Sequence, residues 1–363
     1  MALNNFNILT KTCITALIVG AHTFSFAQTQ GLKDYYQSYF PIGVAVNQRV
    51  ITNEAESKLI VQEFNSITPE NAMKMGPIHP SENEYNWAPV DEMLGYAKIH
   101  GMKMRGHTLC WHNQTPAWFF MKDGVKVSKA LLLERLKVHI GMIMSRYRGQ
   151  IYAYDVVNEA VPDAGTEMLR PSPFLEIIGE EYIAKAFEYA HTADPTAQLF
   201  YNDYNTENPQ KREKIYQLLK KLLAQGVPIH GVGLQGHWSI YEPSYQGLEE
   251  SIKKFSSLGL KVQITEMDVS VFQKEHESRE KTAKDKLVLT DAILQKQAEH
   301  YGKMFEIFRK YKSVITGVTF WNVADNRSWL DNFPVKGRKD YPLLFDENFK
   351  PKPAYFKVID WKK

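Results

Sequence analysis

Short apolar runs rich in β-branched residues alternate along the chain with longer stretches of helical periodicity. A typical longer stretch is KREKIYQLLKKLLAQG, which closes on a glycine, as helix C-termini often do. The apolar runs give way to polar or aromatic residues at their ends. They lie at residues 40–46, 64–70, 102–109, 151–159, 198–205, 229–237, 261–269 and 315–323. The pattern therefore predicts eight β-strands separated by α-helices.

This order of elements predicts a single-domain α/β fold, the (β/α)8 TIM barrel. Strands that alternate with helices run parallel, because a parallel neighbour needs a crossover connection. Eight strands close into such a barrel, and a chain of 363 residues is within the length that one barrel absorbs. Active sites in this fold lie at the carboxyl ends of the strands, which is where the polar residues stand.

The amino terminus has the features of a secretory signal peptide. Lys11 precedes the apolar run CITALIVGAHTF, and SFA, ending at Ala27, matches a small-x-small cleavage pattern. The run is shorter than the roughly 20 residues that a membrane-spanning helix needs. We expect residues 1–27 to be removed and residues 28–363 to form the barrel domain, without a membrane span, in a secreted or periplasmic protein. Cys110 would then be the only cysteine, so no internal disulfide is expected.

Composition narrows the class of partner. The net charge of +3 is small, and Lys and Arg are interspersed with Asp and Glu, so nucleic acid is not an expected partner. Aromatic residues make up 12% of the chain; they fill cores, and they also offer flat surfaces on which sugars can stack. We expect a monomer.

Polar or aromatic residues end nearly every predicted strand. A single one of them is more often a cap or a loop hydrogen bond than a catalyst, but a set converging on one mouth predicts a binding site. In chain order they are Asn47, Glu70 with Asn71, His107, Asn158 with Glu159, Asn202 with Asp203, Gln235 with His237, Glu266, and Trp321.

Two of these residues suggest a reaction. Glu159 and Glu266 end the fourth and seventh predicted strands, so we expect them to face each other across the mouth. Two carboxyl groups flanking a pocket are the minimum set for glycoside hydrolysis, and their separation, which the sequence leaves open, decides between retention and inversion. His237 ends the neighbouring strand, where it would keep Glu266 ionised as a nucleophile and leave Glu159 as the acid. Asn158 is placed to hold a sugar hydroxyl.

Other kinds of site fit the sequence less well. GVGLQG, residues 231–236, matches a dinucleotide-binding pattern, but its glycines lie within a predicted strand and no helix follows. His107, Cys110 and His112 are close in sequence, yet the two histidines would point to opposite faces of a strand, so we expect no metal and no cofactor. The absence of a G-x-S-x-G motif disfavours a serine hydrolase.

The chain resembles glycoside hydrolase family 10, the endo-β-1,4-xylanase family, over about residues 35–361. The motifs that carry the resemblance, in the family's order, are TPENAMK, RGHTLCWH, YDVVNEA, YNDYN, GVGLQGH, ITEMDVS and TFWNVADNRSW. By this resemblance Glu159 would be the acid/base and Glu266 the nucleophile of a retaining reaction on xylan or xylo-oligosaccharides.

Two alternatives stay open at this point. One is a barrel that binds xylan without cutting it, which would be expected to lack one of the two glutamates. The other is a hydrolase that prefers a different β-1,4-glycan, such as cellulose.

The resemblance also implies roles for neighbouring residues. His237 would hydrogen-bond the nucleophile, and Asn158 would contact the 2-hydroxyl of the sugar at the cleaved linkage. The residues implied to bind substrate are Glu70, Asn71 and Lys74 for the next xylose on the non-reducing side, His107, Trp111 and Gln235 as further wall residues, and Tyr204 as a platform on the leaving-group side. Trp321 and Trp329 would crowd the space that a hydroxymethyl group needs, which favours xylose over glucose.

Few positions depart from the family pattern. Met75 stands where the family often has tryptophan, and Met267 where leucine is commoner, a swap of similar volume that should cost little. Residues 272–297 are long and highly charged, and we expect a solvated loop and helix face there. The number of leaving-group subsites stays open because that loop borders them.

Overall fold

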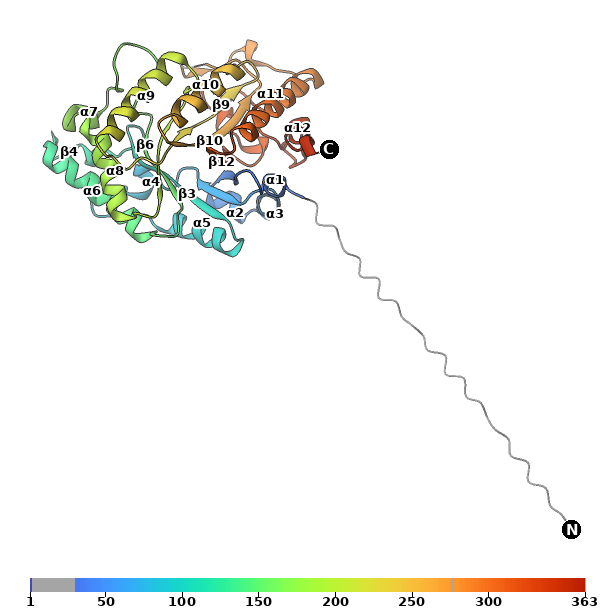
Figure 1. The fold of residues 1–363 in the computed structure, drawn as a ribbon, viewed down its shortest axis with the longest axis horizontal. Coiled ribbons are helices and arrows are strands. Elements are labelled where there is room, and N and C mark those ends of the chain that lie inside the picture. The colour runs from blue at the N-terminus through green and yellow to red at the C-terminus, as the bar shows by residue number, and fades with distance from the viewer. Residues whose placement is uncertain (2–29, 276, 363) are drawn as a thin grey trace.

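A closed barrel of eight parallel strands forms the centre of the molecule (Figure 1). The structure, a computed structural model, describes Met1, residues 30–275 and residues 277–362, so the predicted signal peptide lies outside the described residues except for Met1. Strand β12 pairs with both β1 and β10, which closes the ring and confirms the predicted barrel. In barrel order the strands are β1 (Ile42–Val46), β2 (Ser66–Pro69), β3 (Lys103–Trp111), β6 (Ala153–Asn158), β7 (Gln198–Asp203), β8 (Gly231–Leu234), β10 (Lys261–Ser270) and β12 (Ile315–Phe320).

Helices surround the barrel, as the alternating pattern predicts (Figure 1). Several begin at a side-chain cap; at the start of α6, Ser128 Oγ accepts a hydrogen bond from the backbone N–H of Leu131 at 3.3 Å. None of the described helices is both long and apolar enough to cross a membrane. The helices are α1 (Leu32–Tyr35), α2 (Gln48–Thr52), α3 (Glu54–Glu63), α4 (Met75–Ile78), α5 (Ala88–Ile99), α6 (Lys129–Arg146), α7 (Pro173–Ile178), α8 (Glu181–Ala193), α9 (Pro209–Ala224), α10 (Tyr245–Ser256), α11 (Asp291–Lys310) and α12 (Pro353–Ile359).

Short strands lie outside the barrel. β4 (Met121–Lys122) and β5 (Val125–Lys126) form a hairpin, β9 (His237–Ser239) pairs with the far end of β10, and β11 (Arg279–Glu280) pairs with β13 (Val335–Lys336).

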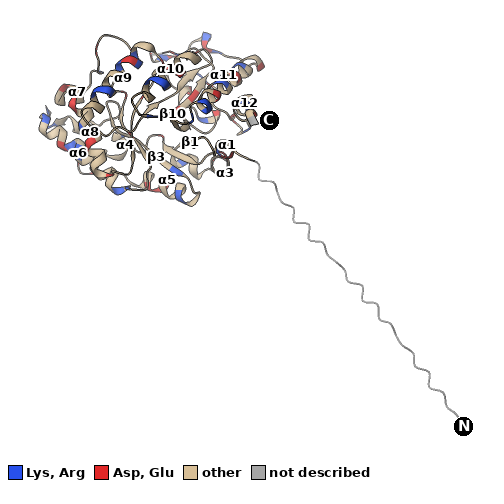
Figure 2. Cartoon of the chain, viewed as in Figure 1, with Lys and Arg blue, Asp and Glu red and all other residues tan. Residues whose placement is uncertain are grey.

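Both signs of charge are spread over the outer helices (Figure 2). Ion pairs join neighbouring helices, such as Lys254 with Glu213 at 2.6 Å and Lys310 with Glu249 at 2.8 Å. Exposed pairs of this kind each contribute about 0–1 kcal/mol, so the stability of the fold rests on its interior.

The sixth and seventh strands differ from the sequence prediction. β8 ends at Leu234, and Gly236, at φ +82°, turns the chain so that His237 opens the separate strand β9. β10 runs through Glu266 to Ser270, because β9 pairs with its last residues. The expectation that His237 and Glu266 end their strands is therefore wrong. Both residues still lie at the mouth, where the added strand lengthens one wall.

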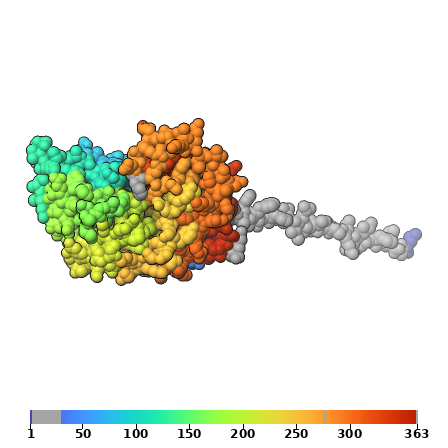
Figure 3. Space-filling model, turned by 90° about the horizontal axis from the view of Figure 1, so that it is seen from above, coloured from blue at the N-terminus to red at the C-terminus, as the bar shows by residue number. Residues whose placement is uncertain are grey.

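The segment after β10 is an exposed loop that leads into α11, as expected, and ion pairs connect it to the rest of the chain. Within residues 272–297, Arg279 Nη2 lies 2.7 Å from Asp285 Oδ1, and Glu275 Oε1 lies 2.6 Å from Arg338 Nη1 in the segment after β12. The β11–β13 pairing joins the same two segments. Residues 277–284 are all exposed, so the expected solvated loop is confirmed, and these ion pairs and the β11–β13 pairing tie it to the segment after β12. The segment belongs to the orange part of the surface, which rises above its neighbours in Figure 3.

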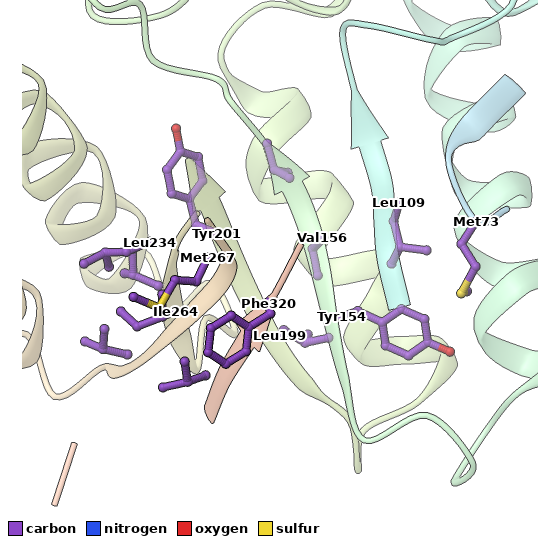
Figure 4. Close-up of a cluster of buried hydrophobic side chains, with 14 of the residues drawn as sticks. Met73, Leu109, Tyr154, Val156, Leu199, Tyr201, Leu234, Ile264, Met267 and Phe320 are labelled. Carbon is purple, nitrogen blue, oxygen red and sulfur yellow. The ribbon is translucent and has the colours of Figure 1, made fainter. Parts of the chain in front are cut away.

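Apolar side chains pack between the strands and the helices around them (Figure 4). Tyr154, Leu199, Ile264 and Phe320, from four different strands, are all at most 2% exposed. Phe320 stacks on Phe305 of α11, with ring centroids 6.1 Å apart. Burial of such side chains contributes about 1.5–3 kcal/mol each, and this layer holds the helices against the barrel.

The interior of the barrel is polar. Arg105 donates two hydrogen bonds to Asp155, at 3.0 and 2.8 Å, and both side chains are at most 1% exposed. His107 Nδ1 lies 3.0 Å from the same carboxylate. A buried ion pair is tolerated only when further hydrogen bonds satisfy its charges, as the histidine does here.

A glycine makes room for another interior polar group. A Cβ atom at Gly233 of β8 would lie 2.1 Å from Asn202 Oδ1 and 2.8 Å from Thr265 Cγ2. Thr265 Oγ1 also donates to Asn202 Oδ1 at 2.6 Å. The missing side chain at Gly233 therefore leaves room for the buried Asn202 amide.

We predict that Gly233→Ala destabilises the protein by about 1–3 kcal/mol, because the added methyl group must displace the Asn202 amide in a packed interior. Urea denaturation followed by circular dichroism measures the change. Gly95→Ala is the matched control: nothing lies within 4 Å of its Cβ position in α5. That substitution should stabilise the helix by up to about 1 kcal/mol. Equal stability of Gly233→Ala and the parent chain would contradict the prediction.

Candidate active site

Two glutamates lie at the carboxyl ends of the strands on well-supported backbone. Glu159 directly follows β6, and its N–H donates to the carbonyl of Asn202 in β7 at 2.9 Å. Glu266 lies within β10, and its N–H donates to the carbonyl of Gln235, just beyond β8, at 2.7 Å. Each carboxyl group thus stands on backbone tied to a neighbouring strand, which is the rigid support that a reacting pair needs.

Amide side chains bridge the two carboxyl groups. Asn202 Nδ2 donates to Glu266 Oε1 at 2.8 Å and to Asn158 Oδ1 at 2.9 Å. Gln235 Nε2 donates to Glu159 Oε1 at 2.9 Å and to Asn158 Oδ1 at 3.2 Å. The oxygen of Asn158 therefore accepts from both neighbours and fixes their orientation, so the two carboxyl groups belong to one network.

Glu266 is held in its ionised form. Its side chain is largely buried, and burial alone would raise its pKa. His237 Nε2 lies 3.1 Å from Oε2, and His107 Nδ1 lies 3.8 Å from Oε1. The nearby His107 and the hydrogen bond from His237 outweigh burial, so the pKa of Glu266 is lowered below its ordinary value.

His237 is itself held in its charged form. Burial opposes that charge, but His237 Nδ1 lies 2.9 Å from Asp268 Oδ2, and together Asp268 and Glu266 raise the pKa of His237 to about 9. Trp329 Nε1 donates to the same Asp268 oxygen at 2.7 Å. At neutral pH both ring nitrogens of His237 are donors, one to each carboxylate.

Glu159 has the opposite electrostatic environment. Burial raises its pKa above the ordinary value, and the negative charges of Asp203 and Glu266 act in the same direction. Hydrogen bonds from Gln235 and from Trp111 Nε1, which lies 3.0 Å from Oε2, oppose this rise without cancelling it. The two glutamates therefore differ in the direction of their pKa shifts, which is the usual mark of an acid paired with a nucleophile.

Lys74 joins the residues after β2 to this mouth. Its Nζ donates to Asn71 Oδ1 at 2.9 Å and lies 5.2 Å from the ring centroid of Trp111 and 6.0 Å from that of Trp321. Burial lowers the pKa of Lys74, while the carboxylates of the mouth, Glu70 among them, oppose the shift. The ammonium group thus lies between two tryptophans and several carboxylates.

Tyr204 lies among cations on another side of the mouth. Arg170 Nη2 donates to its hydroxyl at 2.9 Å, and Lys211 Nζ lies 3.7 Å from its ring centroid. Lys211 also lies 2.8 Å from both Asp163 and Asp203. The ring of Tyr204 is therefore fixed by charged groups from several segments.

Two tryptophans complete the wall after β12. Trp329 lies 4.7 Å from the ring of His237 and stacks on Phe333 at 5.5 Å. Trp321 meets His107 edge to face at 5.2 Å. The structure thus brings every predicted site residue to one mouth.

The comparisons with known proteins agree with this arrangement. The family model of glycosyl hydrolase family 10 matches residues 31–361, which is most of the chain. This chain belongs to glycosyl hydrolase family 10.

Three relatives of this family 10 chain match it over most of the chain. A β-1,4-xylanase of Dictyoglomus thermophilum is 49% identical over 328 residues, which cover 90% of this chain and 90% of that protein. The crystal structure of an endo-1,4-β-xylanase from Caldicellulosiruptor owensensis is 47% identical, with a TM-score of 0.87, and the match covers 92% of this chain and 100% of that one. A mutant structure in complex with xylotriose is 46% identical, with a TM-score of 0.88 and the same coverage.

Sequence reasoning missed several residues of this family 10 site. Asp268 lies two residues after Glu266, and the two-residue period of a strand could have placed both on one face. Asn202 was visible only as a polar strand end, although it bonds directly to Glu266. No sequence pattern pointed to Arg170, because it lies in a loop and not at the end of a predicted strand. Within the described part of the chain, no three His, Cys, Asp or Glu side chains are arranged to hold a metal ion.

We predict that Asp268→Asn lowers the pKa of His237 below about 9, because the substitution removes the adjacent negative charge. NMR titration of the histidine rings measures this pKa. Asp91→Asn, which removes a carboxylate paired with Arg146 on the surface, is the control and should leave it unchanged. An unaltered pKa in Asp268→Asn would contradict the prediction.

The same group should make stability depend on pH. The pKa of His237 is about 9 in the folded chain, against an ordinary value of 6.5 for histidine, so the folded state binds the extra proton. Its stabilisation is complete below pH 6.5 and is lost as pH rises through 9, by up to about 3 kcal/mol. Urea unfolding at several pH values should show this loss in the parent chain and a smaller one in Asp268→Asn.

Proposed function

We propose that this chain is a secreted or periplasmic endo-β-1,4-xylanase that hydrolyses internal xylosidic bonds of xylan. Membership of family 10 and the xylanase relatives support the reaction class. The observation that carries the proposal is the pair of glutamates in one amide network, one with a raised and one with a lowered pKa. The signal-like features of residues 1–27 support export.

The proposed mechanism is a retaining double displacement. Glu266 attacks the anomeric carbon while Glu159 gives its proton to the departing glycosidic oxygen, so the carbon–oxygen bond breaks as the ester to Glu266 forms. Glu159, now a carboxylate, takes a proton from water, and the resulting oxygen attacks the same carbon and releases Glu266. The raised pKa of Glu159 suits the first role, because a general acid must hold its proton until the bond breaks.

His237 supports the nucleophile in both steps. In the resting state it donates to Glu266, and Asp268 on its other side keeps the imidazolium charged. Glu266 loses its charge when it forms the ester, and Asp268 then remains as the partner of the imidazolium. Asn158 is proposed to contact the 2-hydroxyl of the sugar at the cleaved linkage, next to the carboxyl groups that its network joins.

The remaining walls are proposed to bind and select xylose units. Glu70, Asn71 and Lys74 are proposed to hold the sugar on the non-reducing side, with His107, Trp111 and Gln235 as wall residues. Tyr204 would be the platform on the leaving-group side. Trp321 and Trp329 would exclude a hydroxymethyl group, which favours xylan over cellulose.

We predict that Glu159→Gln and Glu266→Gln each lower turnover of xylan by about 10³-fold or more, since each removes a group that reacts directly. Reducing-sugar release from soluble xylan and carboxymethyl cellulose measures this, with strong release from xylan alone. Glu63→Gln is a matched control, because Glu63 is a buried carboxylate that bonds to Tyr355 and Leu32 instead. If the parent chain bound xylan but released no reducing sugar, the protein would be a sugar-binding barrel. If it released more sugar from carboxymethyl cellulose than from xylan, the proposed substrate would be wrong.

We predict that the first product has the β-configuration, because a double displacement inverts the anomeric carbon twice. Proton NMR of freshly cleaved xylo-oligosaccharides, recorded before mutarotation, reports the configuration. An initial α-product would mean that water attacks directly and that Glu266 serves as a base.

A further inference from the structure

We infer that Arg170 is a positioning residue that holds the acid/base Glu159 and the platform residue Tyr204 in one arrangement. The inference rests on the proposed function, since it assigns Arg170 a part in proton transfer from Glu159. It follows from backbone geometry, hydrogen bonds and packing around Glu159.

The backbone of Glu159 needs support from its surroundings. Its φ of +58° is in the left-handed region, which residues other than glycine seldom adopt. Such a conformation persists only where neighbouring contacts impose it. On one side of the peptide, the N–H of Glu159 donates to Asn202 O at 2.9 Å. The other side of the residue depends on Arg170.

Arg170 binds three successive carbonyl groups. Its Nε donates to Glu159 O at 3.0 Å, its backbone N–H to Ala160 O at 2.7 Å, and its Nη2 to Val161 O at 3.3 Å. Ala160 and Val161 are at most 3% exposed, so their carbonyl groups need partners inside the protein. The contacts fix the turn that carries Glu159 out of β6.

The same guanidinium reaches Tyr204. Nη2 donates to the Tyr204 hydroxyl at 2.9 Å, and the guanidinium carbon lies 5.8 Å from the ring centroid. The planar fork of arginine holds its donors in fixed directions. Arg170 therefore couples the position of the acid to that of the proposed leaving-group platform.

Packing alone does not hold Glu159 in place. A void about the size of one water molecule lies beside it, lined by Trp111, His112, Arg170 and Ser172 among others. Because side chains leave this space beside Glu159 unfilled, the placement of the residue depends on the hydrogen bonds around it as well as on packing.

Leaving-group dependence tests this role. A dinitrophenolate departs without a proton, whereas a sugar hydroxyl must receive one from the general acid. A misplaced acid therefore slows cleavage of an oligosaccharide far more than cleavage of an activated aryl glycoside. Loss of folded protein lowers both rates by the same factor. The value of kcat/KM reports only steps up to formation of the ester, so later water attack does not enter.

The experiment compares kcat/KM for xylotetraose and for 2,4-dinitrophenyl xylobioside. For Arg170→Met we expect a loss of about 100-fold on xylotetraose, the scale of a misplaced catalytic group. On the aryl glycoside we expect a loss within about threefold, because no proton is needed there. Arg170→Lys keeps the positive charge but not the planar guanidinium group. Its kcat/KM for xylotetraose should lie between those of Arg170→Met and the parent chain.

Arg135→Met is the matched control. Arg135 Nη1 also donates to three carbonyls of one short segment, those of Trp118, Phe119 and Met121, at 2.5, 3.3 and 3.2 Å. Arg135→Met should leave the ratio of the two kcat/KM values, for xylotetraose and for the aryl glycoside, unchanged. Equal losses on both substrates in Arg170→Met would overturn the inference. If that variant does not fold, as judged by circular dichroism, the same ratio in Arg170→Lys decides.

Glu159→Ala separates the two proposals. It should show the strongest discrimination between the substrates, because the acid is absent. If Glu159→Ala affected both substrates equally, the assignment of Glu159 as the acid would fail, and the role of Arg170 with it. If Glu159→Ala discriminates and neither Arg170 variant does, only the inference about Arg170 fails.

Discussion

Asp155 accepts hydrogen bonds from Arg105 and lies within bonding distance of His107 in the closed interior of the barrel, and the mouth depends on this buried cluster. Removing one partner of such a cluster leaves a charge without compensation in a place that water cannot reach, which typically costs about 3–5 kcal/mol. His107 also lies beside Glu266, so the cluster that fills the barrel influences the ionisation of the proposed nucleophile. The same buried residues therefore both stabilise the barrel interior and affect the ionisation of Glu266.

The side-chain amides at the mouth position the two glutamates without adding charge. Two carboxyl groups in one pocket repel each other when both are charged, and burial favours protonation of both. The amides of Asn202 and Gln235 each bond to one glutamate and to Asn158, so they fix positions without adding charge. The asymmetry between the glutamates comes from His107 and His237, which lower the pKa of Glu266, and from Asp203, whose negative charge raises that of Glu159.

Hydrophobic periodicity was sufficient to predict the barrel, because alternating strands and helices leave few other topologies. The positions of Glu159 and Glu266 at the mouth followed from the same pattern, but the local backbone did not. Whether β10 stops at Glu266 depends on β9, which pairs with it only after Gly236 has turned the chain. The contacts of Asp268 and Arg170 arise from residues distant in sequence, and the pairing of Glu275 and Arg338 does too. Single-sequence patterns report local preference and say little about such partners.

The ion pairs after β10 lie at a surface that solvent reaches, since Arg279 and Glu275 are 38% and 29% exposed as side chains. Such pairs weaken as ionic strength rises, whereas the buried Arg105–Asp155 pair is largely shielded from dissolved ions. The β11–β13 pairing would still join the two segments in concentrated salt. The segments would therefore be held less tightly but would not separate from each other. The surface segments after β10 and β12 are thus sensitive to ionic strength, whereas the buried cluster around Asp155 is not. A rise in salt concentration would therefore act first on these surface segments and only later on the buried cluster beneath the mouth.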